Sequence, residues 1–471
     1  MSPRILHVAA EVAPFASTGG LGLVMRELPA AQRRHGLSAQ VISPLYGFID
    51  RSALIRQDAP VIFELGGETH AVHLWRDAPG HHLFVDAPGL LDREHPYGPP
   101  GQAWPDNPLR FAVLCKAAVA LAEQVDIYHL HDWQAGLCAL YLRGKRRAVQ
   151  SVHNLAYQGL CDFDWADRLE IPHALRSFAG LEYYGEISLL KAGLLLADRL
   201  ATVSPTYAQE ITREPGGRGL ATLFRQRKNG LVGILNGVDG TLWDPAHDPA
   251  LPAAYSAADP SGKAACQVAL RARMGLAEGP VFGIISRAAT QKGLDLLAEA
   301  APAAIAAGAR FAVLTDGAPQ IIAQLRAVAD AHPQAFGLVD HYQDDLARLI
   351  HAGSDFVVLP SRYEPCGLAQ LIGMRYGAIP VVRRTGGLAD TVEDGISGIT
   401  FDDPKAAALG EALQRALALA ADPAALDGLR RHVMALDWSW DRAAADYDRL
   451  LYQPLEVGGL HTMPPREPDR E

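Results

Sequence analysis

Residues 281–307 read VFGIISRAATQKGLDLLAEAAPAAIAA, and this stretch contains the unit from which the fold is built. The short apolar run Val281–Ile285 precedes a polar loop that ends at Gly293, and a helical pattern then covers Leu294–Ala307. Near-continuous apolar runs are typical of parallel strands that are buried on both faces. The stretch therefore predicts a strand, a loop at the carboxyl end of that strand, and a helix.

The same unit recurs along the chain. Strands are predicted in the first half at Ile5–Ala9, Gln40–Ser43, His82–Val85, Ile127–Leu130, Gln150–His153, Leu200–Val203 and Val232–Leu235, and in the second half at Val281–Ile285, Phe311–Leu314, Phe336–Val339, Phe356–Leu359, Ile379–Val382 and Ile399–Phe401. Helical patterns lie between them, for example at Arg110–Gln124, Leu294–Ala307 and Pro319–His332. This alternation predicts an α/β protein with doubly wound parallel sheets.

The chain is too long for one hydrophobic core. It has 471 residues, whereas single cores stop growing at about 250–300 residues. Its composition loosens between Asp244 and Gly279, which indicates a linker that is followed by a helix at Gly262–Met274. We expect two α/β domains at residues 1–240 and 245–440, a C-terminal helix at 441–455 and a polar tail at 456–471. The helix is indicated by Trp440, Ala444, Tyr447 and Leu451, which recur at helical spacing.

The composition excludes several classes of protein. The net charge of −10 disfavours general binding of nucleic acid or of an anionic membrane, because both need a basic face. The 5 cysteines form no CxxC pair, which argues against a disulfide scaffold or a structural zinc site. The chain has no apolar stretch long enough for a membrane span, so we expect a cytoplasmic protein. It also lacks the P-loop, zincin and nucleophile-elbow motifs and the G-x-G-x-x-G fingerprint.

Two glycine-rich loops share a sequence. Thr18-Gly19-Gly20-Leu21 follows the first strand, and Thr385-Gly386-Gly387-Leu388 follows a late strand of the second half. A four-residue match can arise by chance, but both copies lie between a strand and a helix. Glycines there let backbone N–H groups at a helix start approach an anion or a sugar. Two such loops facing each other across a cleft would fit one ligand bound between two similar domains.

Charged residues follow two of the strands in the second half. Arg287 and Lys292 follow Val281–Ile285, and such a pair of cations suits a diphosphate, although two charges on a solvated loop are the simpler interpretation. Glu364 follows Phe356–Leu359, in a turn shaped by Pro365 and Gly367. A carboxylate there could bind sugar hydroxyls or stabilise positive charge at an anomeric carbon. It could equally be an acidic residue favoured at a helix start.

Histidines end two strands of the first half. His129, His131 and Asp132 form an H-x-H-D group, which can be part of a metal site, but no matching set of further ligands can be assembled from the sequence. His153 and Asn154 end the next strand, and a single histidine at such a place is usually structural. Because both strands end in polar groups, they are also candidates for the wall of a binding cleft.

At this point the motifs strongly resemble the bacterial glycogen and starch synthases of the ADP-glucose type, glycosyltransferase family 5. The resemblance rests on SVHNLAYQG at 151–159, ISLLKAG at 187–193, TVSPTY at 202–207, LNGVD at 235–239, SRAATQKGLD at 286–295, PSRYEPCGL at 360–368 and RRTGGLADTV at 383–392. It extends from residue 4 to about residue 452, which is nearly the whole chain. Long motifs in a fixed order are far more specific than any single one of them.

The resemblance implies a GT-B fold, with two Rossmann-like domains facing across a cleft and the C-terminal helix crossing back to the N-terminal domain. It also implies a retaining transfer of glucose from ADP-glucose to the non-reducing end of an α-1,4-glucan such as glycogen, with no metal and no cofactor. Retention of configuration can come from a double displacement or from a front-face route. The family is usually assigned the front-face route.

The family pattern also implies roles for individual residues. Arg287 and Lys292 would hold the donor diphosphate, and Glu364 would contact the donor glucose and support the transition state. The other implied site residues are Asp132, His153, Asn236 and Tyr97 in the sugar pocket, Tyr342 against the adenine, Thr385 and Gly386 at the distal phosphate, and the flanking Ser17, Thr18, Gly19, Gly20, Cys366, Gly367 and Leu368.

The chain departs from the family pattern at several positions. Ser17 stands where the first glycine loop normally has a lysine, and Leu23 stands where the following helix usually has an aspartate. Thr315-Asp316-Gly317-Ala318 replaces a Gly-x-Gly-acidic loop, and Gln134 and Ala369 are further departures. An active α-glucan synthase is the first hypothesis. The alternatives are a weakly active or non-catalytic glucan-binding paralogue, a GT-B transferase with a different donor or acceptor and, most distantly, a metal-dependent hydrolase.

Overall fold

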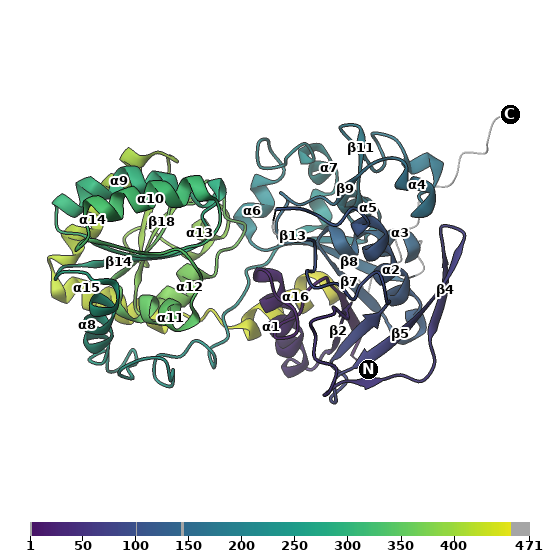
Figure 1. The fold of residues 1–471 in the computed structure, drawn as a ribbon, viewed down its shortest axis with the longest axis horizontal. Helices are drawn as coiled ribbons and strands as arrows, with labels where there is room; N and C mark the ends of the chain where they lie inside the picture. The colour runs from purple at the N-terminus through teal and green to yellow at the C-terminus, as the bar shows by residue number, and fades with distance from the viewer. Residues whose placement is uncertain (1, 100, 143–145, 454–471) are drawn as a thin grey trace. The chain divides into compact units, whose positions relative to one another are not determined.

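The computed structural model describes residues 2–99, 101–142 and 146–453, and the predicted tail at 456–471 lies outside these residues. The chain divides into two compact units (Figure 1). The N-terminal unit comprises the described residues of Met1–Val203, Ala208–Ile234 and Trp440–Glu471. The C-terminal unit comprises Ser204–Tyr207 and Leu235–Ser439. The predicted boundaries at residues 240, 245 and 440 stay predictions.

The N-terminal unit is built on one large sheet, with strand order β13-β12-β8-β7-β1-β2-β6-β5-β3 and with β4 paired to β5. Pairing is parallel from β13 to β6 and antiparallel from β6 to β4. The strands are β1 (Arg4–Val8), β2 (Ser38–Pro44), β3 (Ile55–Arg56), β4 (Val61–Leu65), β5 (Glu68–Arg76), β6 (His82–Asp86), β7 (Ile127–His131), β8 (Arg147–Val152), β12 (Arg199–Thr202) and β13 (Leu231–Gly233).

Helices connect these strands. They are α1 (Gly20–Arg34), α2 (Asn107–Val119), α3 (Gly136–Leu142), α4 (Trp165–Arg168), α5 (Leu189–Leu196), α6 (Pro205–Glu210) and α7 (Ala221–Gln226), with short 3₁₀ turns at Ala122–Gln124, Trp133–Ala135, His173–Leu175 and Lys228–Gly230. A small antiparallel sheet has the strand order β10-β11-β9, with β9 at Leu160–Cys161, β10 at Glu182–Tyr183 and β11 at Glu186–Ser188. The helix α5 begins where the Ser188 hydroxyl accepts the backbone N–H of Lys191.

The C-terminal unit contains one parallel sheet with strand order β16-β15-β14-β17-β18-β19. Its strands are β14 (Val281–Ile285), β15 (Arg310–Leu314), β16 (Phe336–Val339), β17 (Phe356–Leu359), β18 (Ile379–Arg383) and β19 (Ile399–Phe401). Its helices are α8 (Lys263–Met274), α9 (Leu294–Ala306), α10 (Pro319–Ala331), α11 (Asp344–Gly353), α12 (Ala369–Arg375), α13 (Gly386–Thr391), α14 (Ala406–Ala420) and α15 (Pro423–Ala435), with a 3₁₀ turn at Thr290–Lys292.

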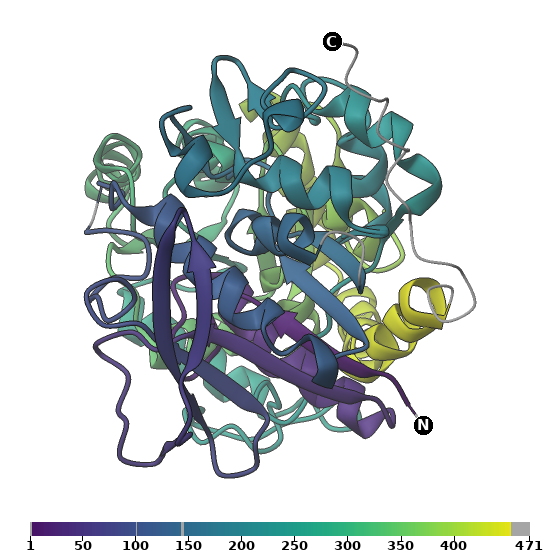
Figure 2. The same cartoon turned by 90° about the vertical axis from the view of Figure 1, so that its right-hand side faces the viewer.

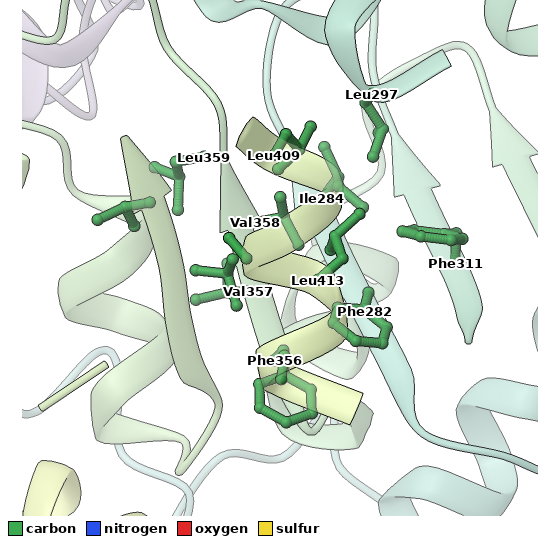
Figure 3. Close-up of a cluster of buried hydrophobic side chains, with 14 of the residues drawn as sticks. Phe282, Ile284, Leu297, Phe311, Phe356, Val357, Val358, Leu359, Leu409 and Leu413 are labelled. Atoms are coloured by element: carbon green, nitrogen blue, oxygen red, sulfur yellow. The ribbon is translucent and has the colours of Figure 1, made fainter. Parts of the chain in front are cut away.

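Helices cover both faces of this second sheet. In Figure 1, α9, α10 and α14 lie on one face, and α8, α11 and α12 lie on the other. Figure 3 shows Leu409 and Leu413 of α14 against Ile284 of β14 and Val358 of β17. Because both faces of the strands are buried, their sequences are apolar almost throughout, and the patterns alone locate them.

The last described segment of the chain belongs to the N-terminal unit. It consists of α16 (Trp440–Tyr447) and a wider helical turn at Asp448–Tyr452. In Figures 1 and 2 this segment, drawn in yellow, lies beside α1, drawn in purple. Tyr447, Leu451 and Tyr452 are fully buried in the core that α1 and β1 form.

The predicted α/β class is confirmed, and each predicted strand is present to within a few residues. The predicted helix at Arg110–Gln124 is α2, which ends at Val119, followed by a separate 3₁₀ turn that ends at Gln124, where Val125 becomes extended. The strands β3 to β5 and β9 to β11 were missed, since they are short or have one exposed face and so lack a continuous apolar run. Among the described residues, no helix is both long and apolar enough to cross a membrane.

Candidate active site

Asp132 and His153 lie at the carboxyl ends of the neighbouring strands β7 and β8, which pair through His131 and Ser151. One carboxylate oxygen of Asp132 accepts the backbone N–H of His153 at 2.7 Å. Asp132 has a φ of 56°, an uncommon backbone conformation for a residue with a side chain. Burial raises the pKa of Asp132, and His153 opposes that shift. The two predicted residues therefore form one fixed group.

A carboxylate that belongs to none of the sequence motifs organises the first glycine loop. Glu11 is 3% exposed. It accepts the backbone N–H of Thr18 at 2.5 Å and its hydroxyl at 2.8 Å, and it also accepts the N–H of Gly19 at 3.3 Å. The Tyr97 hydroxyl donates to it at 2.5 Å. Burial, followed by the charge of Glu11, raises the pKa of Tyr97 well above its ordinary value. Three predicted residues thus meet at one buried acid.

Glu11 gave one signal in the sequence, because it is an acidic residue that interrupts the apolar run after the first strand. Its partner Tyr97 is 86 residues away, so no local pattern joins them. Ser17, by contrast, is exposed, and its hydroxyl donates to the carbonyl oxygen of Gly19 at 3.3 Å. Gly20 is the first residue of α1, so the loop leads directly into a helix N-terminus.

Lys292 and Glu364 form an ion pair in the C-terminal unit. The Nζ atom of Lys292 lies 2.6 Å from Oε2 of Glu364. The Ser361 hydroxyl donates to the same oxygen at 3.0 Å. The Glu364 side chain is 6% exposed, whereas the Lys292 side chain is 22% exposed. A buried carboxylate is thus held by a more accessible cation.

The loops that carry these two residues are fixed to each other. The backbone N–H of Arg362 donates to the carbonyl oxygen of Gln291 at 2.8 Å, and the Gln291 side chain donates to the carbonyl oxygen of Tyr363 at 3.2 Å. The Arg362 guanidinium binds both carboxylate oxygens of Asp295, at 2.7 Å and 2.6 Å. Bidentate pairs of this kind are geometrically specific. Several hydrogen bonds therefore hold the Lys292 loop and the Glu364 loop together.

The second glycine loop lies against the Glu364 backbone. The N–H of Gly387 donates to the carbonyl oxygens of Glu364 and Pro365, at 3.1 Å and 3.2 Å. Gly386 has a φ of 46°, and a Cβ atom added to it would collide with the carbonyl oxygen of Glu364. The motifs at 360–368 and 383–392 thus form one cluster, which contains Thr385 and Gly386 beside Glu364.

Asn236 and Cys366 also lie together. The Asn236 backbone hydrogen-bonds Cys366, and burial raises the pKa of that thiol to about 12. The Oδ1 atom of Asn236 is buried and has no hydrogen-bond partner among the described residues, so it is an acceptor available to a ligand. Gly367 has a φ of 79°, and Leu368 directly precedes α12.

The remaining predicted residues lie on the surface. Arg287 is exposed on the loop after β14. That loop is hydrogen-bonded to residues 315–318, whose sequence departs from the family pattern. The backbone N–H of Ala288 donates to the carbonyl oxygen of Asp316 at 2.5 Å, and the N–H of Ala318 donates to the carbonyl oxygen of Ala288 at 2.7 Å. The segment 315–318 thus holds the Arg287 loop through backbone hydrogen bonds. Tyr342 is 58% exposed, and its hydroxyl donates to Asp344.

His7, His129 and His131 are buried together, with ring nitrogens all within 4.8 Å of one another. His7 of β1 is the neighbour that the sequence did not supply for the H-x-H-D group. Each ring nitrogen of these three histidines has a hydrogen-bond partner. Asp132 is not part of the group, because its carboxylate binds the His153 backbone. The geometry is that of a hydrogen-bonded network and does not leave lone pairs free for an ion.

Two family models match the chain. The starch synthase catalytic domain matches residues 4–226, and glycosyl transferases group 1 matches residues 279–418. A glycogen synthase of Rhodopseudomonas palustris is 41% identical over 96% of this chain and 99% of its own length. A glycogen synthase of Acidiphilium cryptum is 42% identical over 96% of this chain and 99% of its own length.

Solved structures give the same result. The catalytic domain of starch synthase IV from Arabidopsis thaliana, bound to ADP and acarbose, matches with a TM-score of 0.87 and 30% identity over 97% of this chain and all of that one. A sucrose-phosphate synthase from Thermosynechococcus elongatus, at 20% identity and a TM-score of 0.62, shares the fold. The predicted GT-B fold is confirmed. The chain belongs to the glycogen and starch synthase family of glycosyltransferases.

Proposed function

We propose that this chain is a glycogen synthase that uses ADP-glucose and extends an α-1,4-glucan at its non-reducing end, with retention of configuration. The glycosyltransferase class and the role in glycogen synthesis follow from the family. The choice of ADP-glucose, the cytoplasmic location and the residue roles are the proposal. The observation that carries it is the ion pair between Lys292 and Glu364, which joins a cation suited to a phosphate to a carboxylate suited to a sugar.

Lys292 and Arg287 have the chemistry to bind the donor diphosphate. Lys292 is a compact cation and Arg287 a fork-shaped one, and both follow β14 at the carboxyl end of a parallel strand. Positive charge that is already in place stabilises the negative charge that develops on the leaving ADP. The Arabidopsis starch synthase, which was solved with ADP, supports a nucleoside diphosphate at this fold.

Glu364 has the chemistry to act on the glucose. Its carboxylate would stabilise the positive charge that develops at the anomeric carbon as the bond to the phosphate oxygen breaks. In a front-face route, the acceptor 4-hydroxyl forms the new bond on the same face, and its proton passes to the leaving phosphate oxygen. In a double displacement, a protein carboxylate would first displace the diphosphate oxygen from that carbon, and the acceptor 4-hydroxyl, losing its proton, would then displace the carboxylate. Asp132 and His153, which are fixed to each other, would bind sugar hydroxyls.

The test is transfer from two donors. Purified protein is incubated with glycogen and labelled ADP-glucose or UDP-glucose, and Glu364→Ala serves as the control. We expect incorporation from ADP-glucose, loss of it in the control, and no effect of a chelator. Preferential use of UDP-glucose would contradict the donor assignment. Activity that a chelator abolishes and a divalent ion restores would contradict the metal-independent mechanism.

The second candidate is a non-catalytic glucan-binding protein, which is favoured by the serine at position 17 in place of the family's lysine. Its signature would be retention on a glycogen column without transfer from either donor, and that result would exclude the synthase.

A further inference from the structure

A chain of hydrogen-bonded side chains passes through the core of the N-terminal unit. Its first arm starts at Gln32 of α1. The Oε1 atom of Gln32 lies 2.7 Å from Nε2 of His7, and Nδ1 of His7 lies 3.0 Å from Nε2 of His131. The Nδ1 atom of His131 then lies 2.9 Å from Nε2 of His153. The arm therefore connects α1 to a residue of the candidate active site.

The second arm starts at the same glutamine. The Nε2 atom of Gln32 donates to the Tyr452 hydroxyl at 2.9 Å. That hydroxyl lies 2.7 Å from Nδ1 of His129, and Nε2 of His129 lies 2.7 Å from the Ser151 hydroxyl. Each of these four side chains is at most 1% exposed. Tyr452, from the last described segment, is thus connected to the first arm through the side-chain amide of Gln32.

The surroundings of the four histidines in this hydrogen-bonded network favour the neutral form of each imidazole. Burial lowers the pKa of His7 to about 4 and the pKa values of His129 and His131 well below the ordinary value. Burial also lowers the pKa of His153, against the opposing charge of Asp132. A neutral imidazole has one N–H donor and one acceptor nitrogen. The role of one ring nitrogen therefore fixes the role of the other, and with it the direction of the hydrogen bond to the next ring.

The amide of Gln32 sets that direction for both arms. Its carbonyl oxygen faces His7, which must therefore donate through Nε2 and accept through Nδ1. It follows that His131 donates through Nε2 to His7, and His153 donates through Nε2 to His131. On the other arm the Gln32 N–H occupies the Tyr452 oxygen, so the Tyr452 hydroxyl donates to His129.

All four histidines are thus set as Nε2–H tautomers. Turning the Gln32 amide over would exchange every donor with its acceptor and would make them all Nδ1–H. The amide orientation therefore decides which nitrogen of His153 carries its proton. The Nδ1 atom of His153 has no hydrogen-bond partner among the described residues, and in the Nε2–H tautomer it presents a lone pair.

We propose that Gln32, His7 and His131 are positioning residues, anchored by Tyr452, which hold His153 as the Nε2–H tautomer so that its Nδ1 accepts a hydroxyl of the bound sugar. The part that concerns the sugar rests on the proposed function. The tautomer itself is a property of the free protein and is tested without substrate.

The first experiment is long-range ¹H–¹⁵N correlation NMR of the ¹⁵N-histidine-labelled full chain without ligand. His153, His131, His7 and His129 are each assigned by the loss of their signals in single substitutions to glutamine. We expect protonated Nε2 and unprotonated Nδ1 in all four rings. An Nδ1–H tautomer at His153 would overturn the proposal. Stoichiometric binding of added Zn²⁺ that shifts the signals of His7, His129 and His131 would also overturn it, because the group would then be a metal site.

The second experiment compares two hydroxyl deletions. Tyr452→Phe removes the anchor of the Gln32 amide at the start of the second arm, whereas Ser151→Ala removes only the acceptor at the far end of that same arm. We expect Tyr452→Phe to give His153 signals of both tautomers and to reduce kcat/KM for the donor by about 2- to 10-fold. Ser151→Ala should leave the His153 tautomer unchanged, although residue 151 is far nearer to His153 along the chain.

The same effect of both deletions on the His153 signals would show a purely structural role and would overturn the proposal. The two readouts also separate this proposal from the synthase assignment. If the protein transfers no glucose from either donor, the proposed function fails. The tautomer measurement then still decides whether the hydrogen-bonded side chains position His153. Thermal melting of both variants confirms that the comparison is made on folded protein.

Discussion

The ammonium group of Lys292 lies 2.6 Å from the carboxylate of Glu364, so the two residues proposed to act on opposite ends of the scissile bond are paired with each other in the structure. The pair orients both side chains before a donor arrives. It also means that neither residue can be removed without changing the other, since Glu364 is almost fully buried and would lose its counter-ion.

Substitution of Lys292 tests this coupling. Losing a hydrogen bond to a charged group costs roughly 1.5–3 kcal/mol, so Lys292→Ala should lower kcat/KM by about 10- to 150-fold. The double variant with Glu364→Gln should lose less than the product of the two single effects, because the two residues share one interaction. Steady-state kinetics of the four proteins gives the coupling. Strictly multiplicative losses would show that the ion pair plays no part in catalysis.

The glycine at position 386 should be essential for the placement of Glu364. In Gly386→Ala the new methyl group would collide with the carbonyl oxygen of Glu364 at a backbone φ of 46°, and the carboxylate would move. We expect a loss of at least 10-fold in kcat/KM, measured by donor turnover. Gly395→Ala is the matched control, since its φ is 74° but no atom lies within 4 Å of the added methyl group. Equal losses in both variants would point to backbone strain alone.

Restoring the family's lysine at position 17 should increase turnover. Ser17 is exposed, and its hydroxyl donates to the nearby carbonyl oxygen of Gly19. One added hydrogen bond to a charged phosphate predicts that Ser17→Lys raises kcat/KM for ADP-glucose by about 10- to 150-fold. Ser17→Gln, which adds length without charge, is the control. An unchanged rate in both variants would show that this loop does not contact the donor.

The buried histidines should make the N-terminal unit sensitive to acid. Burial holds the pKa of His7 at about 4, against 6.5 for the exposed side chain, and lowers the pKa values of His129 and His131 in the same direction. The unfolded chain therefore binds more protons than the folded one between about pH 4 and 6.5, and the free energy of unfolding falls as the pH drops through that window.

At about pH 5 the loss amounts to about 2 kcal/mol for His7. Urea denaturation at about pH 5 and at about pH 7.5 measures it. The variant His7→Gln should show a smaller difference between the two conditions, because one of the titrating groups is gone. A free energy of unfolding that is the same at both pH values would contradict the lowered pKa values of these histidines in the folded state.

Much of the fold could be predicted because parallel strands buried on both faces are apolar throughout. The run Phe356–Leu359, for example, was located without error. The hairpin of β4 and β5 could not be found in that way, since its exposed face alternates with the buried one. The local context of a strand end also identified Asp132, His153, Lys292 and Glu364 as candidates.

What the sequence could not supply were partnerships between distant residues. In the sequence, Glu11 only ends an apolar run. Its hydrogen bond from the Tyr97 hydroxyl, 86 residues away, becomes visible only in the structure. The bond between His129 and Tyr452 spans 323 residues. Such contacts depend on the three-dimensional path of the chain, which local periodicity does not encode.

The position of the last described segment has a consequence for the order of events during synthesis. Tyr447, Leu451 and Tyr452 fill the core of the N-terminal unit, yet the ribosome makes them only after the about 200 residues of Leu235–Ser439. At about 5–20 residues per second, that interval lasts roughly 10–40 s. During this time the C-terminal unit emerges complete and can fold, while the residues that were made first still lack part of their core. The N-terminal unit, although translated first, is therefore the last to be completed.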